Sequence, residues 1–220
     1  MIYKIAIDGL SGTGKSTVAK RLSKRLSILY VDTGAMYRAI TLYLLNNNID
    51  INDEKVVVKN LNKINIELNA DQTVKLNGED VTNEIRENEI SKCTPIVSRY
   101  KKVREKLVKM QREIAKKESV IMDGRDICTV VFPDADLKLF LTASSRVRAE
   151  RRYKELILKG KDVNLDDIEK ELIERDYIDM HKKFGTLKKA DDAIEIDTTN
   201  MNEQEVEDKI YDLFVKKVGI

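Results

Sequence analysis

The amino-acid sequence predicts an α/β protein with a doubly wound, five-stranded parallel sheet. Short runs rich in Ile, Val, Tyr and Leu recur without the polar alternation of half-exposed strands, which is typical of parallel strands buried on both faces. These runs lie at 2–7, 28–31, 119–122, 137–141 and 193–196. Helical patterns fill the intervals, and this alternation of strand and helix predicts the doubly wound sheet.

Several helices can be predicted between and after the strands. Val18, Ala19, Leu22 and Leu26 recur at helical spacing after the first strand, and a longer helix is predicted from about 100 to 117. Two charged amphipathic helices, whose charges face water, are predicted for "NLDDIEKELIERD" and "NEQEVEDKIYDLFVKKV".

The segment from 64 to 82 does not follow this alternation of buried strands and helices. It alternates apolar and polar residues and carries turn signals at 69–72 and at Asn77-Gly78. This pattern predicts a small antiparallel insertion, with limits near 46 and 95.

Composition and charge narrow the classes of function. A chain of 220 residues is long enough for one domain with a full core, and its net charge of +2 predicts no general attraction to nucleic acid or membrane. Cys93 and Cys128 form no metal or disulfide motif, which favours a reducing compartment, the cytoplasm by default. We expect neither a signal peptide nor a membrane span. His181 is the sole histidine, so chemistry that needs several histidines is disfavoured.

The stretch "GLSGTGKS" fits the pattern G-x-x-x-x-G-K-[ST] after a predicted strand and before a predicted helix. Its glycines let backbone N–H groups converge on phosphate oxygens, Lys15 reaches the outer phosphates, and Ser16 is expected to bind Mg²⁺. The alternative is an ordinary glycine turn. The residues assigned to ATP binding on this pattern are Gly9, Leu10, Ser11, Gly12, Thr13, Gly14, Lys15, Ser16 and Thr17.

The chain lacks the motifs of two other classes of nucleotide-binding protein, the GTPases and the transport ATPases. "NKIN" at 62–65 lacks the aspartate of a guanine-reading motif, and no second glycine signature of a transport ATPase follows. A small kinase needs neither feature, but it needs a second anion site.

Two further polar stretches follow predicted strands and are candidates for that second site. In "VDTGAMYR", Thr33 and Arg38 could meet a phosphate at a helix N-terminus, although Thr33 could instead be only an N-cap. In "MDGRD", Asp123 resembles a metal-binding acid at a strand end, and Arg125 and Asp126 could grip a phosphate and a base amino group. The alternative for this second stretch is a local ion pair.

These stretches, together with "GEDVTNEIR", "KVREKL", "DGRDICTVVFPDADLKLFLTAS" and "RDYID", resemble bacterial cytidylate kinase in the same order and over nearly the whole chain. The motifs "DTGAMYR" and "GRD" before "TVVFPDA" separate this family from adenylate, guanylate and shikimate kinases. The resemblance implies an adenylate-kinase-like core at 1–45, 96–149 and 163–220, a monophosphate-binding insertion at 46–95 and a lid at 150–162. It also implies transfer of the γ-phosphate of ATP to CMP or dCMP with Mg²⁺, in a protein we expect to be monomeric.

Roles for single residues follow from the same resemblance. Arg38, Arg125 and Lys182 would hold the acceptor phosphate, with Thr33 beside them. Arg104 and Asp126 would read the cytosine, and Asp179, braced by Arg175, would meet the sugar. A lid arginine, one of Arg148, Arg151 and Arg152, would close over the ATP phosphates, with Arg151 assigned to the ATP site; a basic helix surface is the alternative. The catalytic residues would be Lys15, Arg125 and Asp126, and the metal-binding residues Ser16 and Asp123.

The chain departs from the family pattern at several positions, among them Pro95, Cys128, Met180, His181 and Lys182; Leu10 and Thr13 in the phosphate loop also differ from it. Lys182 stands in place of an arginine, and a lysine lacks the bidentate fork of a guanidinium group. Two other functions stay open at this point. One is a kinase for another nucleoside monophosphate or metabolite, and the other is a nucleotide-sensing protein without transferase activity.

Overall fold

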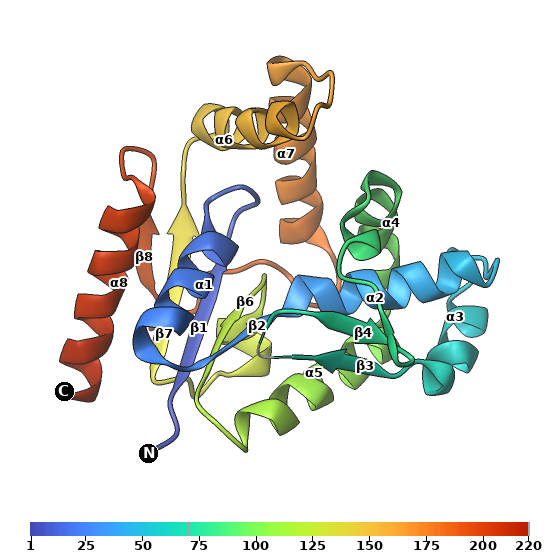
Figure 1. Cartoon of the computed structure of the whole chain (residues 1–220), viewed down its shortest axis with the longest axis horizontal. Helices are drawn as coiled ribbons and strands as arrows, with labels where there is room; N and C mark the ends of the chain where they lie inside the picture. Colours follow the sequence, from blue (N-terminus) through green and yellow to red (C-terminus); the bar gives the residue numbers. More distant parts are fainter. Residues whose placement is uncertain (70, 220) are drawn as a thin grey trace.

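The computed structural model describes residues 1–69 and 71–219 and contains the predicted parallel sheet (Figure 1). The strands are β1 (Lys4–Gly9), β2 (Leu29–Asp32), β6 (Val120–Asp123), β7 (Leu137–Thr142) and β8 (Ile194–Asp197), in the order β2-β6-β1-β7-β8. All four pairings are parallel. Each strand ends one or two residues later than predicted, because polar or glycine residues such as Asp32 and Asp123 still pair in the sheet. The predicted fold class is confirmed.

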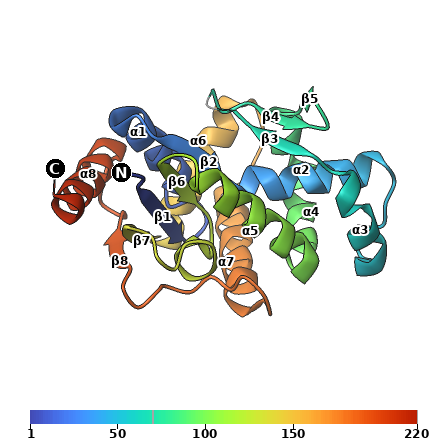
Figure 2. The same cartoon turned by 90° about the horizontal axis from the view of Figure 1, so that it is seen from below.

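The two faces of the sheet are covered by different helices (Figure 2). Side chains alternate along β1, so Ile5 and Ile7 face one side and Ala6 the other. The first side packs against α1 (Lys15–Leu26) and α8 (Glu203–Val218). The opposite side packs against α2 (Thr33–Asn46) and α5 (Lys101–Ala115). Both layers are largely apolar at the sheet, whereas polar residues such as Asp32 and Asp123 lie at the carboxyl ends of the strands.

The insertion contains the predicted antiparallel sheet, formed by β3 (Ile66–Leu68), β4 (Val74–Leu76) and β5 (Glu79–Asp80). Both central residues of the turn Asn77-Gly78 have positive φ, 53° and 92°, as a two-residue hairpin requires. The insertion also contains α3 (Glu54–Asn60), the short 3₁₀ turns Leu61–Lys63 and Glu84–Arg86, and most of α4 (Asn88–Ser98), which continues past the predicted limit at 95; none of these was predicted.

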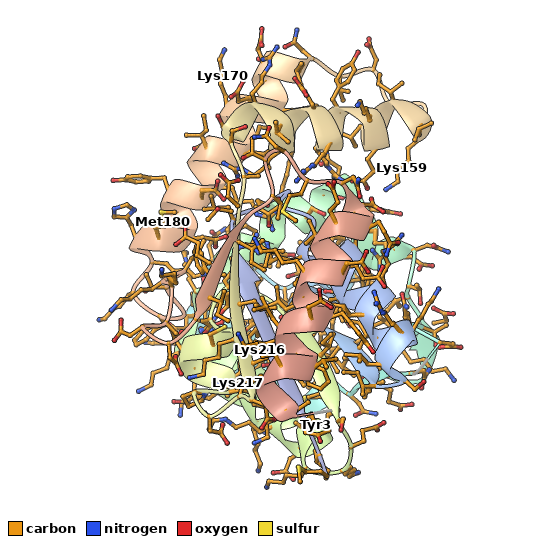
Figure 3. All side chains as sticks on the ribbon, turned by 90° about the vertical axis from the view of Figure 1, so that its left-hand side faces the viewer. Tyr3, Lys159, Lys170, Met180, Lys216 and Lys217 are labelled. Atoms are coloured by element: carbon orange, nitrogen blue, oxygen red, sulfur yellow. The ribbon has the colours of Figure 1, made fainter. Side chains whose placement is uncertain are left out.

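A helical hairpin stands above the carboxyl edge of the sheet at the top of Figure 1. It consists of α6 (Ser145–Leu158) and α7 (Leu165–His181), which pack around Ala149, Ile168 and Leu172. Its outer surface carries charged side chains such as Lys170, and Lys216 and Lys217 do the same on α8 (Figure 3). Within the described ranges, no helix combines the length and apolar character needed to cross a membrane.

Candidate active site

One cleft of about 760 Å³ opens at the carboxyl ends of β1, β2 and β6. Its walls come from the loop after β1, the start of α2, the residues after β6, and the inner faces of α4, α6 and α7. The cleft therefore brings the phosphate loop and both predicted acceptor stretches into one space.

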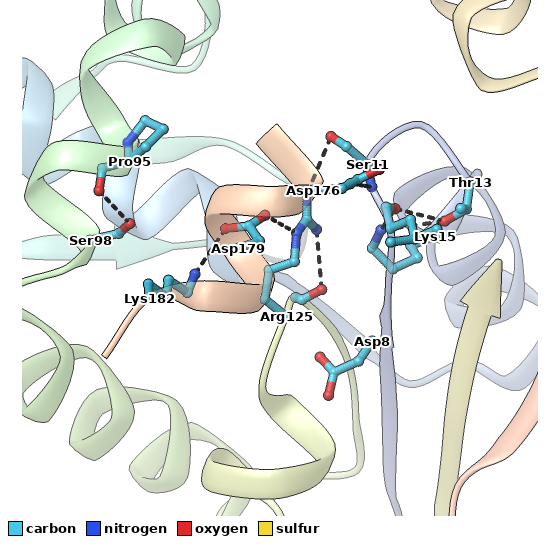
Figure 4. Close-up of polar contacts among 12 residues, drawn as sticks. Asp8, Ser11, Thr13, Lys15, Pro95, Ser98, Arg125, Asp176, Asp179 and Lys182 are labelled. Carbon is cyan, nitrogen blue, oxygen red and sulfur yellow. Dashed lines mark hydrogen bonds and ion pairs between the residues drawn. The ribbon is translucent and has the colours of Figure 1, made fainter. Parts of the chain in front are cut away.

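The loop after β1 has the backbone that its glycines predict. Gly9 has φ 145°, and a Cβ there would lie 2.1 Å from the carbonyl oxygen of Leu141 on β7, so no other residue fits. Gly14 has φ 89° and leads into α1. Thr13 braces the loop, because its hydroxyl donates to the Leu10 carbonyl oxygen at 3.0 Å (Figure 4). The α1 N-terminus thus faces the cleft with its backbone amides free for an anion.

Lys15 lies inside the loop with only 5% of its surface exposed, and its Nζ donates to the Leu10 carbonyl oxygen (Figure 4). Burial, together with the charge of Arg125, lowers the pKa of Lys15 well below its ordinary value. A neighbouring phosphate would counter this effect, because a negative charge favours the protonated amine.

Ser16 and Asp123, the two residues predicted to bind the metal, lie in direct contact. The Ser16 hydroxyl donates to one Asp123 oxygen at 2.7 Å, and the Tyr30 hydroxyl donates to the other at 2.8 Å. Burial and the nearby charge of Asp32 raise the pKa of Asp123. Over residues 1–69 and 71–219, no group of three acidic, histidine or cysteine side chains could enclose a metal. A hydroxyl and one carboxylate still fit Mg²⁺, which takes few protein ligands and completes its shell with phosphate and water.

Thr33 is not the N-cap of α2, which was the alternative considered for it. Asp32 is the N-cap, accepting from the Ala35 amide at 2.8 Å. The buried Thr33 hydroxyl donates instead to the Asp123 carbonyl oxygen at 2.7 Å, which joins β2 to β6 at the floor of the cleft. Arg38 pairs with Asp32 at 3.0 Å, and its buried Nε has no partner among the described residues. Arg38 therefore keeps a donor for an anion.

Arg125 makes long-range contacts rather than the local ion pair considered as an alternative. Its Nε donates to Asp179 at 2.7 Å, and its Nη2 donates to the Ser11 hydroxyl at 3.3 Å (Figure 4). Lys182 donates to the second oxygen of Asp179 at 2.9 Å. Burial alone would raise the pKa of Asp179, but the charges of Arg125 and Lys182 lower it to about 2.

Arg175 lines the cleft but does not brace Asp179 as expected. In the described part of the chain, the ion pairs of Asp179 go to Arg125 and Lys182 instead. Burial and the charge of Arg125 lower the pKa of Arg175 to about 10. Like-charged groups so close together are costly, which favours an anion between them.

Arg104 and Asp126 are brought together from α5 and from the residue after Arg125. Their side chains form a buried ion pair that lines the cleft. Gly185, with φ 63°, lies directly against this pair, because a Cβ there would come within 2.0 Å of the Arg104 guanidinium carbon. Gly185 was not predicted from the sequence, where a glycine in a lysine-rich loop was the available signal.

The five departures from the family pattern outside the phosphate loop differ in their positions. Pro95 on α4 and Lys182 line the cleft. Cys128 is buried, and this burial raises the pKa of its thiol. Met180 points to solvent on the outer side of the hairpin (Figure 3), and His181 stacks on Tyr177 with ring centroids 4.1 Å apart. Of these five, only Pro95 and Lys182 are therefore candidates for a direct effect on a ligand.

The three arginines considered for the lid have different environments. Arg148 is buried and bonded to backbone, donating to the Ala143 carbonyl oxygen at 3.0 Å, so it belongs to the scaffold rather than to a mobile lid. Arg151 lines the cleft and donates to the Thr198 carbonyl oxygen at 2.7 Å. Arg152 also lines the cleft and pairs with Glu155 at 2.7 Å.

Two buried carboxylates that support the site were missed from the sequence. Asp8 on β1 accepts the amides of Ile127 at 2.9 Å and Cys128 at 2.7 Å, and burial raises its pKa to about 6. Asp176 accepts the Ser11 amide at 3.0 Å and pairs with Arg148. An aspartate ending an apolar strand and the "RD" of "RDYID" were the available signals.

Comparison with known proteins finds relatives over nearly the whole chain. The family model described as Cytidylate kinase matches residues 5–216. A cytidylate kinase of Geobacillus sp. is 47% identical over 219 residues, covering 98% of each chain. A cytidylate kinase of Fusobacterium nucleatum is 50% identical over 202 residues, covering 92% of each chain.

Solved structures share the fold at low sequence identity. An uncharacterized protein from Eubacterium ventriosum matches with a TM-score of 0.54 and 13% identity, covering 98% of this chain and 99% of its own. A gluconokinase from Sinorhizobium meliloti matches with a TM-score of 0.51 and 14% identity, covering 97% of this chain and 92% of its own. These matches bear on the fold alone.

Proposed function

The chain belongs to the cytidylate kinase family, and we propose that it transfers the γ-phosphate of ATP to CMP or dCMP, giving ADP and CDP or dCDP. Neither alternative left open by the sequence is favoured by this family membership. The observation that carries the proposal is that a single cleft is lined both by the phosphate loop and by the buried Arg104–Asp126 pair.

The reaction asks the protein mainly to position two nucleotides. An oxygen of the acceptor phosphate attacks the γ-phosphorus, a new P–O bond forms, and the bond to the β,γ-bridging oxygen breaks with its electron pair leaving on ADP. The attacking oxygen is already anionic, so no strong base is needed. Lys15 and the amides from Gly12 to Thr17 hold the ATP phosphates and neutralise the charge that develops on them.

The acceptor phosphate is held by Arg38, Arg125 and Lys182. Support comes from the unpartnered Nε of Arg38 and from the contact of Arg125 with Ser11, which links it to the donor loop. Arg125 is assigned to catalysis because it lies between the two phosphate sites. Arg175 and Thr33 complete the wall. Asp179, which holds Arg125 and Lys182 by ion pairs, is assigned to the sugar.

The base is read by Arg104 and Asp126. Cytosine offers acceptors for a guanidinium group and an exocyclic amine for a carboxylate, so the two halves of this ion pair match its edge. Arg151 is assigned to the ATP side, supported by its position in the cleft next to Thr198, whose hydroxyl donates to the Thr13 carbonyl oxygen at 3.2 Å.

Mg²⁺ is assigned to Ser16 and Asp123. The ion would neutralise charge on the ATP phosphates and help to orient them. This assignment is supported by the 2.7 Å hydrogen bond between the Ser16 hydroxyl and the Asp123 carboxylate beside the phosphate loop.

Three broader assignments belong to the same proposal. Residues 46–95 form the monophosphate-binding insertion and 150–162 the lid, around a core of 1–45, 96–149 and 163–220. The protein is assigned to the cytoplasm, for which the two free cysteines, Cys93 and Cys128, are the support, and it is expected to work as a monomer. Light scattering on the purified chain would test the oligomeric state.

An acceptor panel tests the function. ADP release from ATP is measured by a coupled assay with CMP, dCMP, UMP, AMP or no acceptor. We expect CMP and dCMP to be good acceptors, UMP poor and AMP nearly inert. Equal kcat/KM for CMP and AMP would contradict the cytidylate assignment, and ADP release that ignores every acceptor would contradict a kinase.

A further inference from the structure

The buried ion pair between Arg148 on α6 and Asp176 on α7 holds both backbone polar groups of a single phosphate-loop residue. The exposed fractions of the two side chains are 5% and 8%. The Arg148 Nη1 donates to the Ser11 carbonyl oxygen at 2.9 Å and also contacts one Asp176 oxygen. The other Asp176 oxygen accepts the Ser11 amide at 3.0 Å. The pair thus fixes the peptide units on both sides of Ser11.

The third polar group of Ser11 connects this pair to the acceptor side of the cleft. The Ser11 hydroxyl accepts from the Arg125 Nη2 at 3.3 Å, and the Arg125 Nε donates to Asp179 at 2.7 Å (Figure 4). Asp176 and Asp179 lie less than one turn apart on α7. The same helix therefore holds the donor loop with one aspartate and the acceptor arginine with the other.

The loop also lies close to α6 at the next residue. A Cβ at Gly12, which has φ 76°, would lie 3.2 Å from the Arg148 Cβ. A buried ion pair is weak evidence for stability, because the cost of removing two charges from water can exceed their attraction. Its hydrogen bonds to one loop residue suggest a different use, since phosphoryl transfer depends on placing the reacting groups correctly.

We propose that Arg148 and Asp176 are positioning residues for phosphoryl transfer. They fix the Ser11 backbone so that the loop amides converge on the ATP phosphates, and through the Ser11 hydroxyl they align Arg125 with that loop. This inference rests on the proposed kinase function, and its test includes a measurement that does not depend on the acceptor.

The sharpest test replaces both members of the pair. Arg148→Met with Asp176→Leu removes both charges together and both contacts to the Ser11 backbone. We expect a melting temperature within about 5 °C of wild type and a kcat lower by about 10- to 100-fold. ATP binding, measured by equilibrium dialysis without acceptor, should weaken by about tenfold or more. A pair that served stability alone would leave kcat and the Kd for ATP at wild-type values.

Arg148→Lys tests the same point if the double variant does not fold. It keeps the charge beside Asp176 but cannot donate to the Ala143 and Ser11 carbonyl oxygens in a rigid fork. We expect folding close to wild type with lower kcat and weaker ATP binding. Glu207→Gln is the matched control, because Glu207 is a buried carboxylate paired with Arg21 across α1 and α8; it should leave kcat unchanged.

The outcomes separate this inference from the function on which it rests. Wild-type chain that binds ATP but releases no ADP with CMP would contradict the function, and the dialysis would still test the ion pair. Arg148→Lys with wild-type kcat and wild-type ATP binding would overturn the positioning role even in a fully active cytidylate kinase.

Discussion

Arg125, which follows β6, and Asp179, in the last turn of α7, form an ion pair with a separation of 2.7 Å. The pKa of Asp179 is lowered to about 2, so the carboxylate stays ionised at neutral and mildly acidic pH. The pair therefore persists wherever the enzyme is expected to work. It ties the guanidinium group of Arg125 to α7, the helix whose Asp176 also contacts the phosphate loop at Ser11.

Lys15→Ala is expected to abolish turnover and leave the fold intact. The Lys15 side chain lies in the loop at the cleft, where it would meet charge developing on the phosphates. Loss of such a group lowers kcat by on the order of a hundredfold or more. Steady-state kinetics with a thermal melt would measure both effects, and Lys24→Ala, an exposed lysine on the same helix, is the control. Near-normal kcat in Lys15→Ala would contradict the phosphate-loop assignment.

Lys182→Arg is expected to lower the KM for CMP about threefold and leave the KM for ATP unchanged. A guanidinium group at this position can hold Asp179 and still offer a second hydrogen bond to the acceptor phosphate. Initial rates with each substrate varied in turn would measure the two constants. The neighbouring exposed Lys183→Arg is the control. If the KM for ATP changes instead, Lys182 belongs to the donor side.

The strands and the phosphate loop could be predicted because their signals are local in sequence. Uninterrupted apolar runs mark buried strands, and the loop residues are contiguous. The helices α3 and α4 could not be predicted from the sequence. They are short, and their apolar side chains pack on a cluster shared with α2 rather than forming a long periodic stripe. A short helix whose apolar face packs against residues distant in sequence shows little periodicity of its own.

Side-chain partners at the site were the least predictable feature. Arg175 and Asp179 have helical spacing, which favours a pair one turn apart, but Asp179 pairs with Arg125, 54 residues away in the sequence. Asp32 and Thr33 are both good capping residues, and only the structure distinguishes them. Arg148 has the spacing of a lid arginine, yet it is buried against the loop.

Asp8→Asn is expected to change how stability depends on pH. The folded pKa of Asp8, about 6, lies above its ordinary value of 3.8, so the folded state binds more protons between these values. The Asp8 carboxyl therefore makes wild type less stable as pH rises from about 4 to about 6, by on the order of 3 kcal/mol in total. Asn does not titrate, so the stability of the variant relative to wild type should increase as pH rises over this range.

Urea unfolding at several pH values would measure this difference. The amide also changes the bonds to the Ile127 and Cys128 amides, but that contribution is constant with pH. The exposed Asp191→Asn should show no comparable trend. A difference between wild type and Asp8→Asn that stays flat from pH 4 to pH 7 would show that the buried carboxyl does not titrate in this range.

Asp126→Asn is expected to lower kcat/KM for CMP by about tenfold or more and to narrow the lead of CMP over UMP. The Asp126 carboxylate is buried beside Arg104 and accepts hydrogen bonds only. It suits the exocyclic amine of cytosine, whereas uracil presents a carbonyl that would face it unpaired. An amide can donate to that carbonyl, so the variant loses less with UMP than with CMP. Competition between the two acceptors in one assay would give the ratio directly. The exposed Asp191→Asn should keep the wild-type ratio, and an unchanged ratio in Asp126→Asn would mean that another residue reads the base.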